Sequence, residues 1–452
     1  MKETASLILL RNPDQPEFFW ARRRDEDRFL SGFHVFPGGG VEEADCLLAG
    51  DDVELAARYA ALRETLEETG CSLEGVDPSN LTPAGCWTAP AYLVKAFRTR
   101  FYMLWCDGDP MTEKGDGELS HGEWITPEAA LRRWADHEVL LAPPTRYLVQ
   151  ALAAGAHGDP SIFNESEEAR GQPPTHGPVR PHIMMLPLRT PTLPPATHTN
   201  AYVIGDTELL VVEPASPYEP DRKRLDDYLD ERMANGARIK AIFLTHHHHD
   251  HIGGVVHLAD RLGVPVWAHR ETAARVDFEV ERELEDGESV VLDGRYVIDV
   301  LHTPGHAPGH LCLHDRHSGS LVVGDMVAGV GTILIEPHEG DLAQYLEGLL
   351  RLRDLNPTCL LPSHGPPIGG AVSRLSHYHS HRLMREEKAF SALTQHSQTI
   401  PELVEKVYDD APPMVRMGPG GGLAGLSLQT HLIKLERDGR ASRRENDGWS
   451  LS

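Results

Sequence analysis

The chain has 452 residues, 25% charged and 40% hydrophobic, a balance typical of folded proteins and not of disordered chains. Its 43 Lys and Arg against 68 Asp and Glu give a formal charge of −25, which argues against a protein that coats nucleic acid or anionic membrane. The length predicts about three domains. No apolar run reaches the roughly 18 residues of a membrane span, and the six cysteines form no CxxC pair. The apolar stretch at residues 5–10 is too short and too weakly flanked to be expected as a signal peptide. We therefore predict a cytoplasmic protein without a membrane partner.

The N-terminal third carries a carboxylate motif on a predicted helix. Strand-like runs at residues 6–10, 18–21 and 96–104 surround a helix expected at 53–69, and 63–70 of this region are R-E-T-L-E-E-T-G. Glu64, Glu67 and Glu68 stand at i, i+3 and i+4, so they share one helix face and repel one another. A hard divalent cation, Mg²⁺ or Mn²⁺, would compensate the repulsion. The alternative is a solvated acidic stripe.

This motif, together with F-P-G-G-G at 36–40, resembles the Nudix hydrolase family. The resemblance implies a Nudix α/β/α domain at residues 1–155 that cleaves a nucleoside diphosphate-linked substrate, with Arg63, Glu67 and Glu68 as catalytic residues and Glu64 as a further metal ligand. The segment between the glycines and the helix is longer than usual, as in the subgroup with coenzyme A diphosphatases. A coenzyme A-type molecule is therefore one candidate substrate, and the choice of substrate is left open. Glu118 and Glu123 are candidate general bases. A non-enzymatic nucleotide sensor is the alternative.

Residues 156–180 are rich in Gly, Pro and Glu and lack apolar periodicity, which predicts a linker. From 181 to 370, short β-branched strands alternate with helices. Residues 245–251, T-H-H-H-H-D-H, directly follow one strand, and T-P-G-H at 303–306, G-D at 324–325 and S-H-G at 363–365 follow others. We expect these motifs to converge on one rim of a sheet. Imidazole and carboxylate groups suit zinc, iron or manganese, whereas the alternative is a solvated polar loop.

These four motifs resemble the metallo-beta-lactamase fold superfamily, an αββα sandwich. The resemblance implies two metal ions about 3.5–4 Å apart and a bridging water, acidified to a pKa of about 7, as the nucleophile. Asp250 would also orient that water, and Glu213 stands where many relatives carry a supporting Asp. The implied ligands are His246, His248 and His306 for one ion, Asp250, His251 and His364 for the other, and Asp325 as the bridge. The surplus histidines are expected on the surface or supporting the site: His247, His249, His302, His310, His314 and His317.

Residues 371–452 predict a linker helix followed by a winged helix. Helices are expected near 400–408 and 426–436, a turn at 438–440 and a terminal strand pair, and the glycine run 418–422 is expected to be a mobile loop. The order of lactamase core, linker helix and winged helix resembles the beta-lactamase-like protein 2 family, which includes single-strand-specific endoribonucleases. Five basic residues could follow a phosphate backbone, although a solvated face of a packing domain is the alternative: Lys434, Arg437, Arg440, Arg443 and Arg444.

The sequence thus predicts a multidomain α/β protein with two hydrolytic sites. We expect the central site to hold two Zn ions (or Fe or Mn) and to hydrolyse phosphodiester bonds, with single-stranded RNA as a candidate partner. One alternative is a glyoxalase II-like thioesterase, because H-H-H-H-D-H-I-G-G at 246–254 looks much like that family and the acidic charge favours it. Another is an iron-dependent sulfur dioxygenase, which needs one metal, so the second ligand set argues against it.

Overall fold

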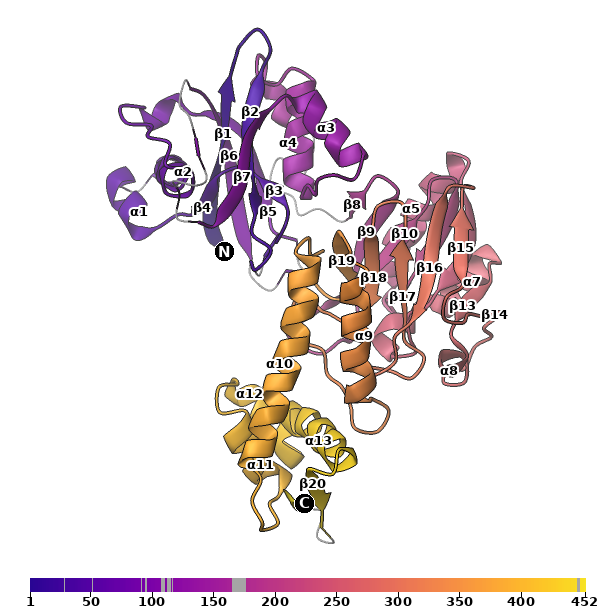
Figure 1. The fold of residues 1–452 in the computed structure, drawn as a ribbon. Helices are drawn as coiled ribbons and strands as arrows, with labels where there is room; N and C mark the ends of the chain where they lie inside the picture. Colours follow the sequence, from indigo (N-terminus) through magenta and orange to yellow (C-terminus); the bar gives the residue numbers. More distant parts are fainter. Residues whose placement is uncertain are drawn as a thin grey trace. The chain divides into compact units, whose positions relative to one another are not determined.

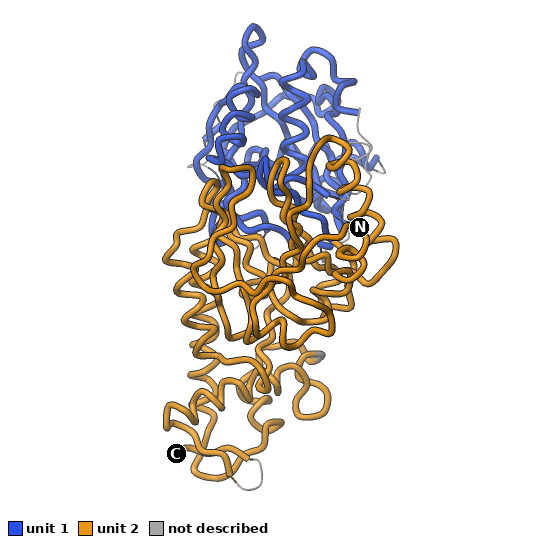
Figure 2. Tube along the Cα trace, turned by 90° about the vertical axis from the view of Figure 1, so that its right-hand side faces the viewer, with its two compact units in different colours: residues 1–187, 366–370 blue, residues 188–365, 371–452 orange. Residues whose placement is uncertain are grey.

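The computed structural model describes all residues except 28, 51, 91, 94–95, 107–109, 112–114, 116, 165–175 and 445–447. The chain divides into two compact units, one of residues 1–187 with 366–370 and one of residues 188–365 with 371–452 (Figure 2). Residues 165–175 of the predicted linker lie outside the described residues. No helix in the described part of the chain is both long and apolar enough to cross a membrane.

The first unit is built on a mixed sheet around β1 (Lys2–Arg11). β1 pairs in parallel with β6 (Phe97–Trp105) and antiparallel with β2 (Glu17–Arg23), and β7 (Leu119–Ile125) continues beyond β2 (Figure 1). The other elements of this unit are β3 (His34–Val35), β4 (Gly38–Gly40), α1 (Glu43–Ala49), α2 (Val53–Thr69), η1 (Pro78–Asn80), β5 (Thr82–Thr88), α3 (Pro127–Ala135), α4 (Pro143–Ala153), η3 (Pro160–Asn164) and β8 (Gly177–Arg180).

Both faces of this sheet are covered by helices, because successive side chains of a strand point to opposite faces. Leu7 and Leu9 of β1 pack in one core with the alanines of α2, which allow the helix a close approach. Ile8 and Leu10 pack in the other core with apolar residues of α3 and α4. The unit therefore has the expected three-layer α/β/α arrangement.

The second unit contains two sheets. One has the strand order β14–β13–β12–β11–β10, and the other has the order β15–β16–β17–β18–β19. β9 (Ile183–Arg189) crosses the boundary between the units. The elements are β10 (His198–Ile204), β11 (Glu208–Val212), α5 (Glu219–Ala234), β12 (Arg238–Phe243), α6 (His249–Ile252), α7 (Val255–Leu262), β13 (Val266–Ala268), α8 (Arg270–Ala273), β14 (Arg282–Glu283), β15 (Ser289–Leu292), β16 (Tyr296–His302), β17 (Leu311–Asp315), β18 (Ser320–Gly324), α9 (Leu342–Asp354) and β19 (Cys359–Pro362).

The C-terminal part of this unit begins with the long helix α10 (Ala371–Ala392), which packs against α9 (Figure 1). It is followed by α11 (Ile400–Val407), α12 (Pro413–Arg416), η4 (Pro419–Gly421), α13 (Gly422–Arg437) and the hairpin of β20 (Ala441–Arg443) and β21 (Trp449–Leu451). Leucines of α11 and α13 share a core with Trp449. This is the expected winged-helix order.

The glycine run is not the open loop that the sequence predicted. It forms η4 and the first residue of α13. A Cβ on Gly421 would lie 2.8 Å from Val404 Cγ2, and one on Gly425 would lie 1.8 Å from the carbonyl oxygen of Gly420. All four glycines of the run have positive φ angles, and close packing additionally excludes a side chain at Gly421 and, one turn into α13, at Gly425.

Candidate metal centre

The four histidine and aspartate motifs of the second unit meet at strand ends that come from both sheets. The histidine run follows β12 of one sheet, whereas His306, Asp325 and His364 follow β16, β18 and β19 of the other. The expected single rim is therefore a junction of two sheets, joined where Leu311 N donates to the Thr245 carbonyl at 2.8 Å. Loops that leave strand ends carry the side chains, and the strands fix where the loops begin.

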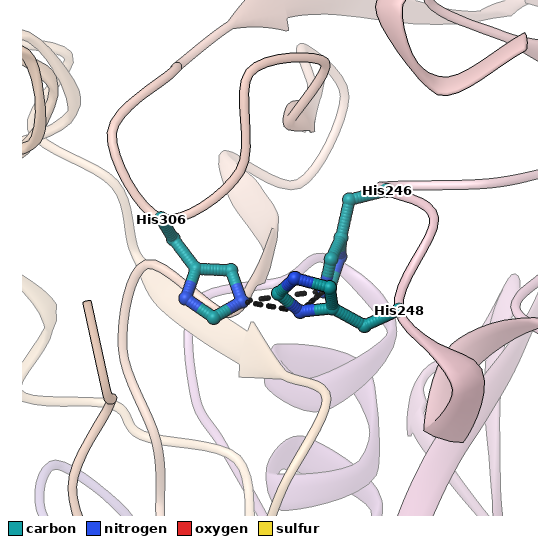
Figure 3. A group of neighbouring side chains, drawn as sticks. All are labelled: His246, His248 and His306. Atoms are coloured by element: carbon teal, nitrogen blue, oxygen red, sulfur yellow. Dashed lines mark hydrogen bonds between the residues drawn. The ribbon is translucent and has the colours of Figure 1, made fainter. Parts of the chain in front are cut away.

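Three imidazoles converge in the first group. His306 Nε2 lies 3.0 Å from His248 Nδ1 and 3.3 Å from His246 Nε2, and the last two nitrogens are 3.0 Å apart (Figure 3). Three ring nitrogens this close can hold a cation between them, since all three ligand atoms lie within 4.8 Å of one another. Burial lowers the pKa of His306 to about 4 and that of His246 well below its usual value, so both rings are neutral, as metal ligands must be.

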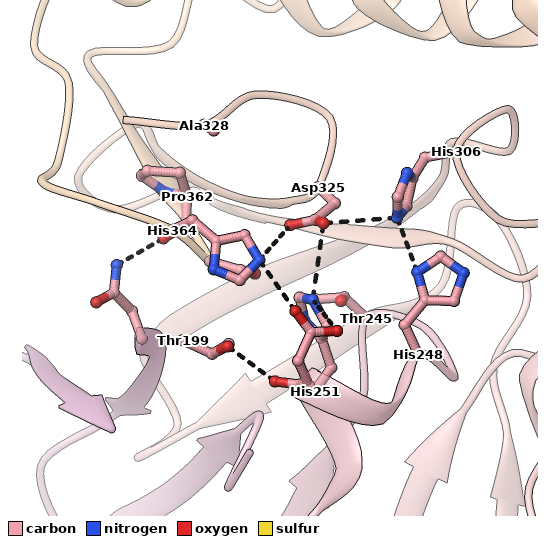
Figure 4. A network of polar contacts seen from close by, with 12 residues as sticks. Thr199, Thr245, His248, His251, His306, Asp325, Ala328, Pro362 and His364 are labelled. Carbon is pink, nitrogen blue, oxygen red and sulfur yellow. Dashed lines mark hydrogen bonds and ion pairs between the residues drawn. The ribbon is translucent and has the colours of Figure 1, made fainter. Parts of the chain in front are cut away.

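The second group consists of Asp250, His251 and His364, again with ligand atoms within 4.8 Å. Asp250 lies 3.7 Å from His251 Nε2 and 3.6 Å from His364 Nε2. Asp325 lies between the two groups, with Oδ2 3.5 Å from His306 Nε2 and Oδ1 3.5 Å from His364 Nε2 (Figure 4). All seven predicted ligands are therefore brought together.

Two atoms of this cluster test whether a metal fits. His251 Nε2 and Asp325 Oδ1 are buried and have no hydrogen-bond partner among the described residues. Unpaired buried polar atoms are costly, so the arrangement is suited to a bound cation. Burial opposes charge on both groups, yet the carboxylates of Glu213, Asp250 and Asp325 raise the pKa of His251 well above its usual value. Without a metal ion, a proton on His251 thus compensates the negative charge of these carboxylates; a bound cation would take over that compensation.

Each ligand histidine is oriented through its other ring nitrogen. A carbonyl or carboxylate can only accept a hydrogen bond, so the contacting ring nitrogen donates and the opposite nitrogen keeps its lone pair for a metal. The partners are the Leu334 carbonyl for His306 (2.8 Å), the His198 carbonyl for His364 (2.9 Å), Glu213 for His251 (3.0 Å), Thr245 Oγ1 for His246 (2.9 Å) and Glu339 for His248 (2.5 Å).

Glu213 supports both sheets of the junction. Its fully buried carboxylate accepts hydrogen bonds from Thr245 Oγ1, from His251 Nδ1 and from Ser363 Oγ at 2.7 Å. Since Thr245 donates to Glu213, its oxygen accepts the proton of His246. One Glu213 oxygen also lies within 4.8 Å of ligand atoms of His246 and His251. Its three hydrogen bonds nevertheless give it the supporting place that its position after the second strand had suggested.

Glu339 is a residue that the sequence analysis missed. It lies between β18 and α9, and its two oxygens contact His247 Nε2 at 3.0 Å and His248 Nε2 at 2.5 Å. The hydrogen bonds from both rings hold the pKa of Glu339 well below its usual value. Glu339 is 91 residues from His248, and no local pattern marks it, so only the folded chain reveals the contact.

His310 is the most buried of the surplus histidines. Its Nε2 accepts the backbone N–H of Asp325 at 3.0 Å, and its Nδ1 contacts Thr303 Oγ1 at 2.9 Å. Burial lowers its pKa well below the usual value, so the ring is neutral and accepts. A Cβ on Gly324 would lie 2.4 Å from this nitrogen, which explains the glycine before Asp325. His310 therefore positions the Asp325 backbone.

In the first unit, the acidic motif surrounds Arg63 of α2. Arg63 Nη1 contacts Glu64 at 3.1 Å and Glu67 at 2.9 Å, while Nη2 donates to Asp45 at 2.9 Å. Glu68 instead accepts the N–H of Gly38 at 2.7 Å. Of the three predicted metal ligands, Glu64 and Glu67 thus contact Arg63, whose positive charge compensates theirs, whereas Glu68 contacts the glycine loop.

Two further features define this acidic site. A Cβ on Gly39 would lie 2.4 Å from Glu64 Cδ, so the glycine loop must approach the helix closely. Burial raises the pKa of Glu64, and the neighbouring charges of Glu67 and Glu118 act in the same direction against Arg63. Of the two candidate bases, Glu118 is close enough for its charge to raise the pKa of Glu64. Glu123 instead accepts hydrogen bonds from Arg133 at 2.5 Å and from Trp20 Nε1 at 3.2 Å.

The longer segment after the glycine loop forms helix α1. Asp45 in this helix accepts the Glu42 N–H at 2.9 Å and so closes the first turn. Its side chain is 3% exposed and also binds Arg63 through both oxygens. The extra segment therefore adds a buried carboxylate to the site.

Three of the five basic side chains considered for a phosphate backbone are already ion-paired. Lys434 contacts Glu386 at 3.1 Å and Asp438 at 2.8 Å. The other two pairs join Arg437 to Asp341, and Arg440 to Glu387 at 3.3 Å. Neighbouring carboxylates thus neutralise these three positive charges, which disfavours a basic groove at this surface.

Comparison with known families agrees with this architecture. Residues 1–143 match the NUDIX domain, residues 194–364 match the metallo-beta-lactamase superfamily and residues 399–449 match the beta-lactamase associated winged helix domain. A beta-lactamase domain protein from Burkholderia ambifaria has a similar fold, with a TM-score of 0.54 and 22% identity over 61% of this chain and 93% of its own.

Two curated relatives match about half of the chain. A beta-lactamase-like protein 2 homolog from Caenorhabditis elegans is 31% identical over 250 residues, which are 53% of this chain and 79% of the relative. An atrochrysone carboxyl ACP thioesterase from Aspergillus chevalieri is 28% identical over 47% of this chain and 69% of its own length. Members of the matched families generally use divalent metals. The chain is thus a metal-dependent hydrolase of the metallo-beta-lactamase superfamily, belongs with the beta-lactamase-like protein 2 homologues and carries a NUDIX domain at its N-terminus.

Proposed function

We propose that the second unit hydrolyses its substrate with two divalent metal ions. One ion would be held by the His246, His248 and His306 group and the other by Asp250, His251 and His364, with Asp325 close to both groups. The observation that carries this proposal is the convergence of two three-residue groups around one aspartate. A single-metal sulfur dioxygenase would leave the second group without a role.

When bound, such ions polarise a carbonyl or phosphoryl oxygen and acidify water. The chain's own contribution is to hold each ligand atom in place. Asp250 is ionised, since its nearby histidines keep its pKa below the usual value against the effect of burial. Its backbone carbonyl accepts the Thr199 hydroxyl at 2.8 Å (Figure 4), which holds the main chain that carries the carboxylate. From this place the carboxylate can orient a water and accept a proton.

We infer that the substrate is an acyl thioester. The ion-paired basic residues near the C-terminus offer little free positive charge for a long polyanion, and one relative is a thioesterase by name. A phosphodiester such as single-stranded RNA is the second candidate, supported by the winged-helix domain. For the first unit we propose cleavage of a nucleoside diphosphate-linked or coenzyme A-type substrate with Mg²⁺ or Mn²⁺, held by Glu64, Glu67 and Glu68.

The test uses the full chain, freed of metal and reloaded with Zn²⁺, Mn²⁺ or Fe²⁺. Acyl-coenzyme A thioesters are assayed by thiol release and end-labelled single-stranded RNA by gel, with wild type, His251→Ala and the exposed-site control His396→Ala. We expect wild type and the control to release thiol and His251→Ala to lose one metal and most activity. RNA cleavage without thiol release would select the phosphodiester. Full metal content and hydrolysis in His251→Ala would refute the metal assignment.

The Nudix site is tested separately with Glu67→Gln. We expect Mg²⁺-dependent cleavage of a coenzyme A or nucleoside diphosphate probe to fall, while hydrolysis by the second unit is unchanged. Unaltered Mg²⁺-dependent cleavage in this variant would contradict the assignment of the first unit.

A further inference from the structure

The segment between β18 and α9 is held by two residues of the C-terminal helices. Arg382 of α10 donates a short hydrogen bond to the carbonyl of Ile333. Thr430 of α13 donates to the carbonyl of Ile335 at 2.7 Å. All four residues are buried, so neither carbonyl has water as an easy substitute. The C-terminal helices therefore hold this segment by hydrogen bonds to two carbonyls that are two residues apart.

The carbonyl between those two points belongs to Leu334, and it accepts the Nδ1 proton of His306 at 2.8 Å. This hydrogen bond leaves the lone pair of His306 Nε2 facing His246 and His248. The same segment carries Glu339, which contacts His248. A displacement of this backbone would thus disturb the orientation of two rings of the first group.

Further contacts hold the segment between β18 and α9 in place. Arg382 lies over the Tyr345 ring at 5.5 Å, and the Tyr345 hydroxyl donates to the carbonyl of Met326 at 2.6 Å. Tyr378, one turn before Arg382 on α10, accepts the N–H of Ala328 at 3.1 Å. The segment from 326 to 335 is therefore fastened along its length to α9, α10 and α13.

We propose that the C-terminal domain is a positioning element of the metal centre, in which Arg382 and Thr430 hold the backbone on either side of the Leu334 carbonyl and thereby orient His306. This inference rests on the proposed function, in which His306 binds a metal ion. It gives the winged helix a role that needs no nucleic acid. Arg382 and Thr430 are positioning residues and contact no metal.

The experiment compares Thr430→Val, which keeps the shape but removes the hydroxyl, with Thr430→Ser, which restores it. Thr399→Val is the matched control, because Thr399 caps α11 and bonds Glu402 in the same domain without touching the segment. Zn²⁺ affinity is measured by chelator competition on the full chain, and Co²⁺ absorption reports the coordination of the first group.

Removing a direct hydrogen-bond partner of a metal ligand typically costs 10- to 100-fold in metal affinity. Because Thr430 holds the backbone beside that partner and does not contact the ligand, we expect a smaller loss of about 3- to 10-fold for Thr430→Val. Thr430→Ser and Thr399→Val should bind metal like wild type. Arg382→Lys, whose shorter ammonium cannot reproduce the guanidinium contact, should show the same selective loss if Thr430→Val folds poorly. The Co²⁺ spectrum should change in these two variants.

The outcomes separate the two proposals. If His306→Ala binds metal like wild type, the proposed function itself fails. If His306→Ala loses one ion but Thr430→Val and Arg382→Lys match wild type, the positioning role is refuted and the metal site stands. Equal losses in Thr430→Val and Thr399→Val would also overturn it, since general destabilisation of the domain would then explain the effect.

Discussion

Replacing Glu213 by alanine removes the buried carboxylate that joins the two sheets under the metal centre. Glu213 is fully buried and receives hydrogen bonds from Thr245, His251 and Ser363, which follow strands of both sheets. Alanine leaves these donors without their acceptor in a site that excludes water. We therefore expect Glu213→Ala to destabilise the second unit strongly.

The magnitude follows from the three contacts. Hydrogen bonds to a charged group contribute about 1.5–3 kcal/mol each, so three give an upper range of about 5–9 kcal/mol. The actual loss is smaller, because the Thr245 oxygen keeps the proton of His246 Nδ1 at 2.9 Å and because His251 can lose its proton once the carboxylate is gone. Breaking a buried charged pair costs about 3–5 kcal/mol, and we expect a loss in that range.

Hydrogen exchange is the suitable assay, because one unfolding midpoint is poorly defined for a chain with two units. Amides of β11, β12 and β19 are followed in the metal-free protein. At about 1.4 kcal/mol per factor of ten, the expected loss speeds their exchange by about two to four orders of magnitude. The control is Glu231→Ala, an exposed glutamate of α5 in the same unit.

Glu213→Gln refines the test. Its amide oxygen can still accept from Thr245 and His251, and the Ser363 hydroxyl can turn to accept from the amide nitrogen. Exchange in this variant should lie between those of wild type and Glu213→Ala. If amides of Glu213→Ala exchange within about threefold of wild type in all three strands, the three hydrogen bonds to Glu213 do not stabilise the second unit by several kcal/mol.

Three further predictions concern other carboxylates. Glu339→Gln should weaken binding of the metal held by the first histidine group by about tenfold in chelator competition, while Glu336→Gln on the same segment should not. Asp45→Asn should lower Mg²⁺-dependent cleavage by the first unit, because Arg63 loses a charge-assisted, two-point contact; unchanged kcat/KM would contradict this role for α1. Hydrogen bonds from residues 206–208 outweigh burial and hold the pKa of Asp293 at about 2, below the unfolded value of about 3.9. The stability lost in D293N should therefore be full above pH 5 and vanish as pH falls toward 2, as measured by hydrogen exchange of β11 amides in the metal-free protein.

Local sequence features predicted the elements well where their termination signals were strong. The helix expected at 53–69 begins and ends there, since Asp52 accepts two N–H groups at its start and Gly70 takes a left-handed conformation at its end. The ligand set came from the resemblance to the metallo-beta-lactamase superfamily and stays a prediction. The meeting of its four motifs could be expected from the strands that precede them. Each follows a short apolar strand, and strand ends bring distant loops together.

Glu339 and the specific contact made by His310 could not be predicted, because both depend on contacts between distant parts of the chain. Glu339 reaches the histidine run across 91 residues, and His310 lies beneath Asp325 only because β17 and β18 are neighbours. The glycine run misled for the opposite reason. Its composition is that of a flexible loop, but residues 419–421 form η4, and tight packing against Val404 leaves no room for a side chain at Gly421.

The salt dependence of any RNA binding would show whether the winged helix is a nucleic-acid platform. If all five basic side chains at 434–444 met phosphates, the logarithm of the binding constant should fall with the logarithm of salt concentration with a slope of about −3.5, at about 0.7 per phosphate of single-stranded RNA. Lys434, Arg437 and Arg440 already face carboxylates, which leaves at most two phosphate contacts and a slope of about −1.4. The measurement is a filter-binding titration at several salt concentrations. A slope near −3.5 would mean that RNA displaces these ion pairs, and a phosphodiester substrate would then be favoured over a thioester.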